Sequence, residues 1–230
     1  MHLLFDKQVL VDVVKDVSPL MTGGFIYPFS EFATPRDQLV KRLGYQPNSA
    51  AAIAEAKSLL AAAGQNAMKP LDFMVRDLNH HKLFGQAVHA MLAEAGISAN
   101  LRTVVESVWF GDAAAGNYDL AVGAIVSTLL DPSDYFNAWY RTGAPQNYSF
   151  WHNEEFDKLV DQIDLEVDAD KRLAIVRRAE EVMEQDPPFV PVAWENILDA
   201  WYTYVKGHNP RDYFGIYDVV RFDTFWLDKA

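Results

Sequence analysis

The fold is set by one stretch, Asn117-Tyr-Asp-Leu-Ala-Val-Gly-Ala-Ile-Val-Ser-Thr-Leu-Leu-Asp-Pro-Ser-Asp-Tyr-Phe136, in which a turn signal, an apolar run and an Asp-Pro break follow one another. Residues 120–126 show neither helical spacing nor regular alternation of apolar and polar side chains. A short continuous run between turn residues is typical of a strand covered on both faces in a parallel sheet. The pair Ser127-Thr128 then falls at the strand's carboxyl end, the edge where open α/β sheets bind ligands.

The composition is that of a folded protein that does not bind nucleic acid. The chain has 230 residues, of which 50% are hydrophobic, so it can bury a substantial core. Its formal net charge is -12 and it contains no run of Lys and Arg, whereas nucleic-acid binding needs clustered positive charge. We therefore expect no nucleic acid among its partners.

The chain contains no cysteine, which excludes disulfides, thiolate metal sites and cysteine nucleophiles. Residues 1–14 are too charged for the apolar core of a signal peptide and lack a small-residue cleavage site. No apolar run approaches transmembrane length. We expect no signal peptide in this chain, and we expect it to begin inside a longer protein.

The segment before the opening stretch predicts alternating strands and helices. Residues 71–76 are a predicted strand, a helix follows from about Lys82 to Gly96, and residues 100–105 form the next strand. Residues 108–115 predict a short helix that leads into the strand at 120–126. By the usual handedness rule, these elements form two right-handed βαβ crossovers in a parallel sheet.

The first 64 residues predict two helices on either side of an irregular loop. The loop, residues 25–47, holds three prolines and shows no sustained period, and such loops usually pack over a larger body. The second helix ends at Gly64, a residue suited to the left-handed position after a helix. The apolar faces of the two helices are Phe5, Leu10, Val13 and Val14, and then Ile53, Ala56, Leu59, Leu60 and Ala63.

The last third of the chain predicts further helices and an extended segment. A helix follows Pro132, a second begins at Glu154, and a third is capped by Asp168. The sequence Asp186-Pro-Pro188 ends this third helix, and residues 189–194 are a predicted strand. The remaining residues predict short strands mixed with Gly207, Pro210 and Gly215.

Short sequence patterns recur in a fixed order along most of the chain, and in that order they resemble one family. It is the bacterial extracellular solute-binding proteins of family 5, the oligopeptide, dipeptide and nickel group of ABC importers, in their carboxyl-terminal half. No single pattern is specific, so order and spacing carry the resemblance. The patterns are Phe5-Asp-Lys-Gln-Val-Leu-Val-Asp12, Leu59-Leu-Ala-Ala-Ala-Gly64, Met91-Leu-Ala-Glu-Ala-Gly-Ile97, Gly116-Asn-Tyr-Asp-Leu120, Asp131-Pro132, Asn147-Tyr-Ser-Phe-Trp-His-Asn-Glu-Glu-Phe-Asp157, Ala169-Asp-Lys-Arg172, Glu184-Gln-Asp-Pro-Pro-Phe-Val-Pro191 and Val205-Lys-Gly207.

The resemblance implies a bilobal fold whose lobes close on a solute by a hinge. The expected fold class is α/β: a periplasmic-binding-protein-like lobe with a mostly parallel sheet flanked by helices. Residues 1–190 resemble the second, carboxyl-terminal lobe, and residues 191–230 resemble the return segment toward the first lobe. Family members are longer and carry a signal or lipoprotein peptide, so we expect the full-length protein in the periplasm or at the cell surface. Either the sequence was trimmed, or the gene is truncated or its start misassigned.

The implied function is that of the substrate-binding component of an ABC importer, with the membrane permease subunits as partners. We expect no enzyme and no cofactor, because the sequence has no Gly-x-Ser-x-Gly, His-Glu-x-x-His or phosphate-loop motif. The alternative is an interaction or docking module, or a truncated lobe that does not bind solute alone. Apolar surface exposed around residues 189–201 would distinguish it, and we expect the fragment to form a homodimer through that surface.

The ligand prediction depends on where the resemblance fails. In peptide-binding members, the strand that matches residues 120–126 ends in Gly-Trp, and an Asp that pairs with the peptide's amino terminus follows. Ile125 takes the place of that Trp and Thr128 the place of the Asp, while Val122 stands where some members have an Arg. A hydroxyl supplies no counter-charge for a buried ammonium. We therefore expect a neutral, polyhydroxylated or otherwise modified solute rather than a plain dipeptide, and the candidate solutes are an oligopeptide, a modified peptide or a sugar-like compound.

The predicted ligand-binding residues are Ile125, Ser127 and Thr128, together with three rings that have a second interpretation. Trp194 could stack on a solute or pack at the hinge. Trp109 could face the cleft or the core. His80 could point into the cleft or into solvent, and the helix terminus beside it could hold an anionic group. His81 and His89 lie two turns apart without a carboxylate to complete a set, so we expect no metal site.

Overall fold

A computed structural model describes residues 1–42, 44–46, 50–64, 69–124, 127, 129–195, 200–207 and 224–229. Ile125 and Thr128, two predicted ligand contacts, lie outside these residues. The elements are η1 (His2–Leu4), α1 (Lys7–Val14), β1 (Leu20–Thr22), α2 (Arg36–Leu39), α3 (Ala50–Ala62), β2 (Leu71–Arg76), α4 (Asn79–Glu94), β3 (Ala99–Val104), α5 (Glu106–Ala115), β4 (Leu120–Ala121), α6 (Pro132–Tyr135), the π-helix η2 (Phe136–Tyr140), α7 (Glu154–Leu165), α8 (Ala169–Gln185), β5 (Ala193–Glu195), β6 (Val205–Lys206) and β7 (Trp226–Leu227).

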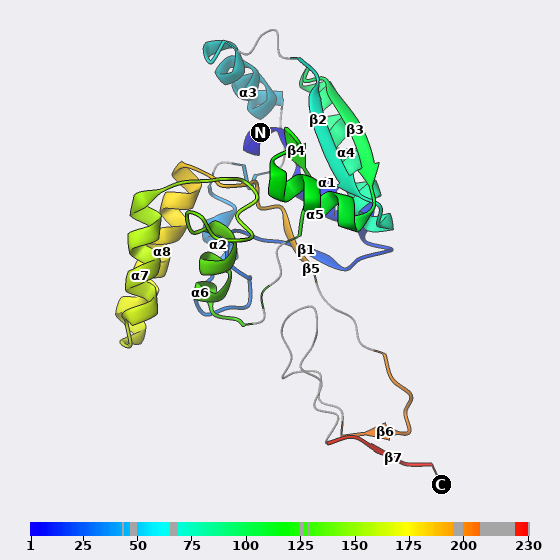
Figure 1. Cartoon of the computed structure of the whole chain (residues 1–230), viewed down its shortest axis with the longest axis vertical. Helices are drawn as coiled ribbons and strands as arrows, with labels where there is room; N and C mark the ends of the chain where they lie inside the picture. The colour runs from blue at the N-terminus through cyan, green and yellow to red at the C-terminus, as the bar shows by residue number, and fades with distance from the viewer. Residues whose placement is uncertain are drawn as a thin grey trace.

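A three-stranded parallel sheet in the order β3-β2-β4 confirms the predicted α/β fold (Figure 1). Strand β2 has the predicted bounds, while α4 begins at Asn79 rather than at Lys82. Strand β4 is shorter than the predicted strand at 120–126, because only Leu120 and Ala121 pair with β2, and the Val122 N–H donates to the Met74 carbonyl. The chain therefore leaves the sheet earlier than the apolar run suggests.

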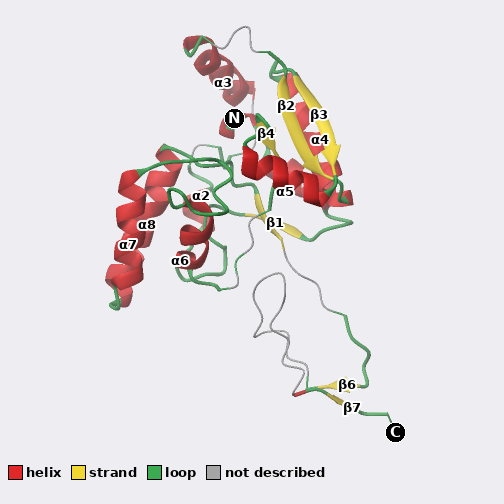
Figure 2. Cartoon of the chain, viewed as in Figure 1, coloured by secondary structure: helices red, strands yellow, loops and turns green. Residues whose placement is uncertain are grey.

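The two faces of the sheet are covered by different helices (Figure 2). On one face, Phe73 and Val75 of β2 pack in a buried cluster with Val88 and Leu92 of α4. On the other face, Met74 packs with α5. Side chains of a strand alternate between faces, so the nearly continuous apolar run of β2 is explained by burial on both sides.

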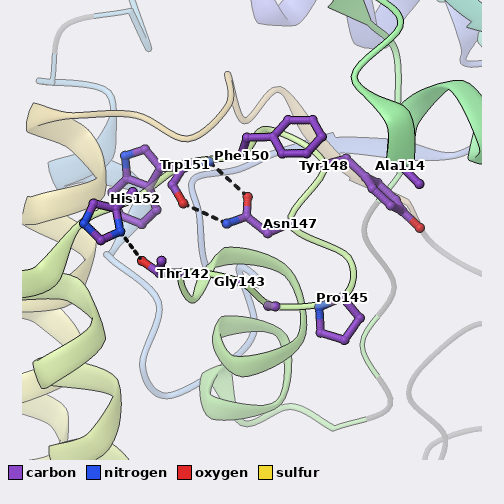
Figure 3. A pocket seen from close by; sticks show the side chains of 10 residues that line it. Ala114, Thr142, Gly143, Pro145, Asn147, Tyr148, Phe150, Trp151 and His152 are labelled. Carbon is purple, nitrogen blue, oxygen red and sulfur yellow. Dashed lines mark hydrogen bonds between the residues drawn. The ribbon is translucent and has the colours of Figure 1, made fainter.

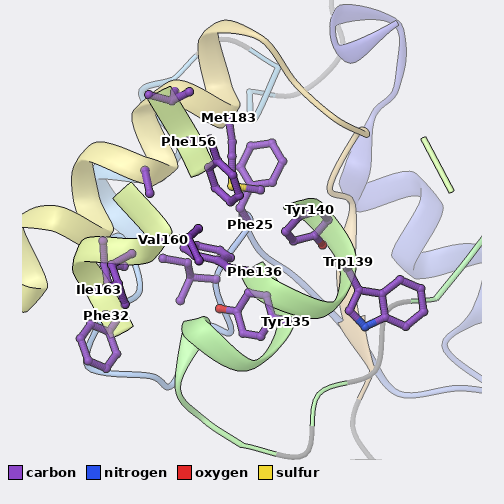
Figure 4. Packing of buried hydrophobic residues seen from close by; sticks show 14 residues of the cluster. Phe25, Phe32, Tyr135, Phe136, Trp139, Tyr140, Phe156, Val160, Ile163 and Met183 are labelled. Atoms are coloured by element: carbon purple, nitrogen blue, oxygen red, sulfur yellow. The ribbon is translucent and has the colours of Figure 1, made fainter. Parts of the chain in front are cut away.

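The helices beyond β4 form a second body around an aromatic core (Figure 4). Helices α7 and α8 pack side by side, and Asp168 caps α8 as predicted, accepting from the Lys171 N–H at 3.0 Å. The loop before α2 supplies Phe25, Ile26 and Phe32 to this core. Packing of the loop over a larger body is thereby confirmed.

Two predicted apolar faces are corrected by the structure. Val13 of α1 is 41% exposed and Leu59 of α3 is 58% exposed. Successive helical residues point about 100° apart, so the stripe formed by Leu10 and Val14 faces the core while Val13 turns to solvent. In α3 the neighbouring Leu60 packs on the sheet body, and Leu59 is rotated away for the same reason.

The short strands β1 and β5 pair antiparallel between the sheet and the helical body. Of the predicted strand at 189–194, only Ala193 and Trp194 enter this pairing, and Glu195 extends it by one residue. Strands β6 and β7 pair with each other and extend away from both bodies in Figure 1. Among the described helices, none combines the length and apolar character needed to cross a membrane.

A buried lysine lies where the amino-terminal helix meets the loop after α2. Lys7 is 5% exposed, and its Nζ lies 2.9 Å from both His2 Nε2 and the Gly44 carbonyl oxygen. Burial lowers the pKa of Lys7 to about 7, although the charge of Glu184 opposes the shift. The unfolded chain therefore binds a proton that the folded chain lacks between pH 7 and 10.5.

The free energy of unfolding should therefore rise with pH between pH 7 and 10.5, and Lys7→Met should flatten this rise. The unfolded state binds more protons there, so the group adds up to about 1.4 kcal/mol per pH unit. Urea unfolding at several pH values checks this. Lys15→Met, an exposed lysine just after the same helix, is the control that should leave the slope unchanged. An equal slope in the Lys7 variant would show that Lys7 is charged in the folded protein.

Candidate functional site

The strand order places a topological switch point at the carboxyl ends of β2 and β4. From β2 the chain moves to β3 on one side and then crosses to β4 on the other side of β2. Ligands of open α/β sheets bind outside the carboxyl ends of the strands at such a switch point. Here that edge is formed by Arg76 and the first turn of α4, the start of α5, and Gly123 after β4. We call this the carboxyl edge.

Arg76 is the cation of the carboxyl edge. Its side chain is 13% exposed, and its guanidinium lies 5.8 Å from the ring centre of Trp109 and 5.4 Å from that of Phe110. Nη2 donates to the carboxylate of Glu106, which is 60% exposed. Nε is buried and has no hydrogen-bond partner among the described residues. Buried polar groups are normally satisfied, so an unpaired one is unusual.

Two imidazoles occupy the first turn of α4. The rings of His80 and His81 meet edge to face at 4.6 Å, with His80 half-buried and His81 6% exposed. Burial, aided by the charges of His80 and Arg76, lowers the pKa of His81 to about 4. His81 is therefore neutral at pH 7, and its buried Nδ1 has no partner within the part of the chain that the structure describes.

Trp109 lies beneath the carboxyl edge rather than open to it. It is 4% exposed in a cluster with Met74 and Ala113, which is the core interpretation of this residue. A Cβ added to Gly123 would come 3.1 Å from its Cζ2 atom, so the indole supports the chain directly after β4. Its Nε1 is a third buried polar atom without a partner among the described residues.

Ser127 and Trp194, two further predicted contacts, and His89 are engaged within the protein. Ser127 is 6% exposed, and its hydroxyl lies 2.8 Å from Asp134 Oδ2 and 2.7 Å from the Leu129 carbonyl oxygen. The Trp194 indole N–H donates to the Gly24 carbonyl at 3.0 Å, as a hinge-packing residue would. His89 Nε2 lies 2.9 Å from the Ala99 carbonyl oxygen, which separates it from the histidines of α4's first turn.

A separate open pocket of about 330 Å³ lies between the end of α5 and the loop at 142–152 (Figure 3). Its polar groups already bond to one another. The Asn147 amide donates to the Arg141 and Trp151 carbonyls, and His152 Nδ1 lies 3.1 Å from Thr142 Oγ1. The polar side chains of Asn147, Thr142 and His152 are thus already engaged there, so the carboxyl edge, with its unpaired polar atoms, is the stronger candidate.

Of the predicted residues, the carboxyl edge includes His80 and has Trp109 beneath it, but it does not include Trp194. Sequence reasoning missed Arg76 and His81 as site residues. A lone arginine at the end of a strand carries no local signal, and His81 differs from His80 only by the face of α4 that it occupies. The doublet His80-His81 at a helix start was the one available hint.

Comparison with known proteins identifies the relatives of this chain. The profile described as bacterial extracellular solute-binding proteins, family 5 middle, matches residues 1–147. A probable deoxycholate-binding periplasmic protein of Escherichia coli is 28% identical over 223 residues, covering 93% of this chain and 40% of that protein. A dipeptide-binding protein of Bacillus subtilis is 23% identical over 227 residues, covering 97% and 39%.

Solved structures share the fold over the whole chain. The murein tripeptide binding protein of Escherichia coli superposes with a TM-score of 0.78 at 21% identity, covering 100% of this chain and 44% of that one. An oligopeptide-binding protein of Haemophilus influenzae in complex with the peptide RPPGFSPFR gives 0.76 at 22% identity, covering 99% and 44%. The chain thus spans about two fifths of the length of the curated relatives it matches.

Proposed function

The chain belongs to the bacterial extracellular solute-binding proteins, family 5, and on this premise we propose that it captures a small solute at the carboxyl edge for an ABC importer. The observation that carries the proposal is the β3-β2-β4 order, whose switch point falls beside three buried polar atoms that have no partner among the described residues. Lobe closure and binding energy would then be the whole mechanism. Proteins of this family bind solutes and are not enzymes.

The assignment of the chain to two lobes rests on the same premise. We assign residues 1–190 to the second lobe and residues 191–230 to a return segment toward a first lobe. The position of β6 and β7, away from both bodies, supports this assignment. The deoxycholate-binding relative is a periplasmic protein, so we place the full-length protein in the periplasm, with the permease subunits of its importer as partners.

The solute is proposed to be something other than a plain dipeptide. The names of the relatives include dipeptides, oligopeptides and deoxycholate as ligands of those proteins. The departure from peptide binders at Ile125 and Thr128 remains a prediction, because both residues lie outside the described ones. Tight calorimetric binding of an unmodified dipeptide would overturn this preference.

Fewer observations support the alternative that the chain is a docking module. Within the predicted surface at 189–201, Phe189 stacks on Tyr140 at 5.0 Å and Trp194 is half-buried. Trp201 and the adjacent Tyr202 are exposed. Concentration-dependent sedimentation that disappears in Tyr202→Ser would support a homodimer through these rings.

Calorimetry with the 230-residue chain tests the proposed function. The solutes are deoxycholate below its critical micelle concentration, an unmodified dipeptide and an oligopeptide. We expect one-to-one binding of at least one of them, weakened about threefold to tenfold by His80→Ala through loss of a contact. Lys69→Ala, exposed just before the opposite end of β2, is the control. The proposal fails if none of the three binds, or if the Lys69 variant weakens binding as much as the His80 variant.

A further inference from the structure

We propose that Arg76 receives the anionic group of the solute, so that the carboxyl edge selects amphipathic organic anions. The inference rests on the proposed function and names the class of solute bound at that site. Three features carry it: the unused hydrogen-bonding capacity of Arg76, the electrostatics of the first turn of α4, and the apolar side chains beside the guanidinium.

The unused capacity is apparent from the other partly buried arginines. Arg102 donates to Asp72, Asp112 and the Asn117 carbonyl at 2.6–2.7 Å. Arg172 donates to both oxygens of Asp131 at 2.7 Å and to the Ile163 carbonyl. Arg76 uses Nη2 alone among the described residues. A guanidinium presents five N–H groups in a fork that matches a carboxylate or phosphate.

The first turn of α4 adds a favourable field for an anion. This helix has 16 residues, and no described side chain caps its amino terminus at Leu78. Free backbone N–H groups and the positive end of the helix dipole favour negative charge there. The Nδ1 of His81, which lacks a described partner, belongs to a residue more than nine-tenths buried in the same turn. Lys82 and Asp77 form an ion pair at 2.8 Å, so their charges largely cancel.

The neighbouring surface suits an apolar body attached to the anion. Phe110 of α5 is 37% exposed, and its ring face contacts the guanidinium of Arg76. A charged head at Arg76 would therefore lie next to an incompletely covered aromatic ring, and covering that ring favours binding in proportion to the apolar area removed from water.

Glu106 competes with the solute for Arg76. It is the one carboxylate that Arg76 contacts among the described residues, and it is largely exposed, so an incoming anion can displace it at low cost. Removal of its charge should strengthen anion binding, whereas removal of Arg76 should weaken it. Opposite effects from two adjacent residues are not expected of a merely structural pair.

The test compares deoxycholate, an amphipathic carboxylate, with its uncharged methyl ester by calorimetry on the 230-residue chain. Arg76→Gln should weaken deoxycholate binding about tenfold to hundredfold, the range of hydrogen bonds to charged groups. Glu106→Gln should tighten it about twofold to fivefold. The ester should bind the unmodified chain more weakly than the acid and be insensitive to both variants. Arg178→Gln, an exposed ion-paired arginine of α8, is the matched control.

Circular dichroism melting of each variant separates a folding defect from a binding defect, and Glu106→Gln keeps the test informative if Arg76→Gln does not fold. Equal binding of acid and ester, unchanged by Glu106→Gln, would overturn the role of Arg76 while leaving solute capture intact. Absence of binding by deoxycholate, its ester, a dipeptide and an oligopeptide would overturn the proposed function itself.

Discussion

Replacing Trp109 by Ala should lower the free energy of unfolding by about 3–5 kcal/mol, the usual cost of removing a buried aromatic ring. Its indole is 4% exposed and fills the space between Met74 of β2 and Ala113 of α5. It also lies under Gly123 and beside the guanidinium of Arg76. The cavity would therefore open directly below the carboxyl edge, and solute binding should fall together with stability.

Trp109→Phe should cost much less than Trp109→Ala. The phenyl ring keeps most of the contact with Met74 and Ala113, and the change removes an indole N–H that has no partner among the described residues; leaving such a group buried costs about 1–3 kcal/mol. Val108→Ala, at an exposed position of the same helix, should change stability by no more than about 0.5 kcal/mol. Chemical denaturation of the three variants measures this order. A Trp109→Ala chain as stable as Val108→Ala would contradict the core role of the indole.

Replacing Glu180 by Ala should destabilise the helical body by a similar amount, about 3–5 kcal/mol, because it leaves partly buried cations without their anion. Glu180 is 1% exposed. Its carboxylate accepts from the Thr34 hydroxyl and lies 3.7 Å from Arg42 and 3.5 Å from Arg177. The residue thus ties α8 to the loop that carries Thr34 and to the segment after α2.

The neighbouring Glu181 provides the control. Its side chain is largely exposed and pairs with Arg178 at 3.1 Å, so Glu181→Ala should change stability by less than about 1 kcal/mol. Glu180→Gln keeps the shape and an acceptor oxygen of the side chain and removes a charge that burial disfavours, so its stability should lie closer to that of Glu181→Ala than to that of Glu180→Ala. Urea denaturation at neutral pH measures the three values, and equal losses from both alanine variants would contradict the role of Glu180.

Glu180 should also make the stability of the folded chain depend on pH. Burial raises the pKa of Glu180 above its ordinary 4.5, so the folded carboxyl takes up a proton before the unfolded one as pH falls. The stabilisation linked to this proton is complete below pH 4.5 and is lost as pH rises through the folded pKa. The stability deficit of Glu180→Gln relative to the unmodified chain should therefore widen on acidification. A deficit that narrows would show that the carboxylate is favoured, not penalised, in the folded protein.

The sheet was predictable because its signal is local. The apolar run at residues 71–76 and the helix ending at Gly96 carry their periods within a few residues, and β2 and α4 appear there. Asp168 was predictable as a cap for the same reason. The short β4 was not, since pairing depends on how far the chain runs beside β2, which residues 120–126 do not encode.

The candidate site was only partly predictable because its contacts are between elements. Which face of α5 meets Arg76 depends on the crossover from β3, and no spacing in the sequence reports it. The position of Trp109 in the predicted helix did not tell whether its side chain is buried or exposed. The loop at 25–47 likewise gave no period, although Phe25 and Phe32 enter the helical core.

Solute should bind at the carboxyl ends of β2 and β4. Amide chemical shifts of the isotope-labelled 230-residue chain, followed by NMR during titration with deoxycholate or a dipeptide, test this location. The shift changes should be concentrated at residues 76–81, 105–110 and 122–124. Changes concentrated instead in the loop at 142–152, which lines the open pocket, would contradict it.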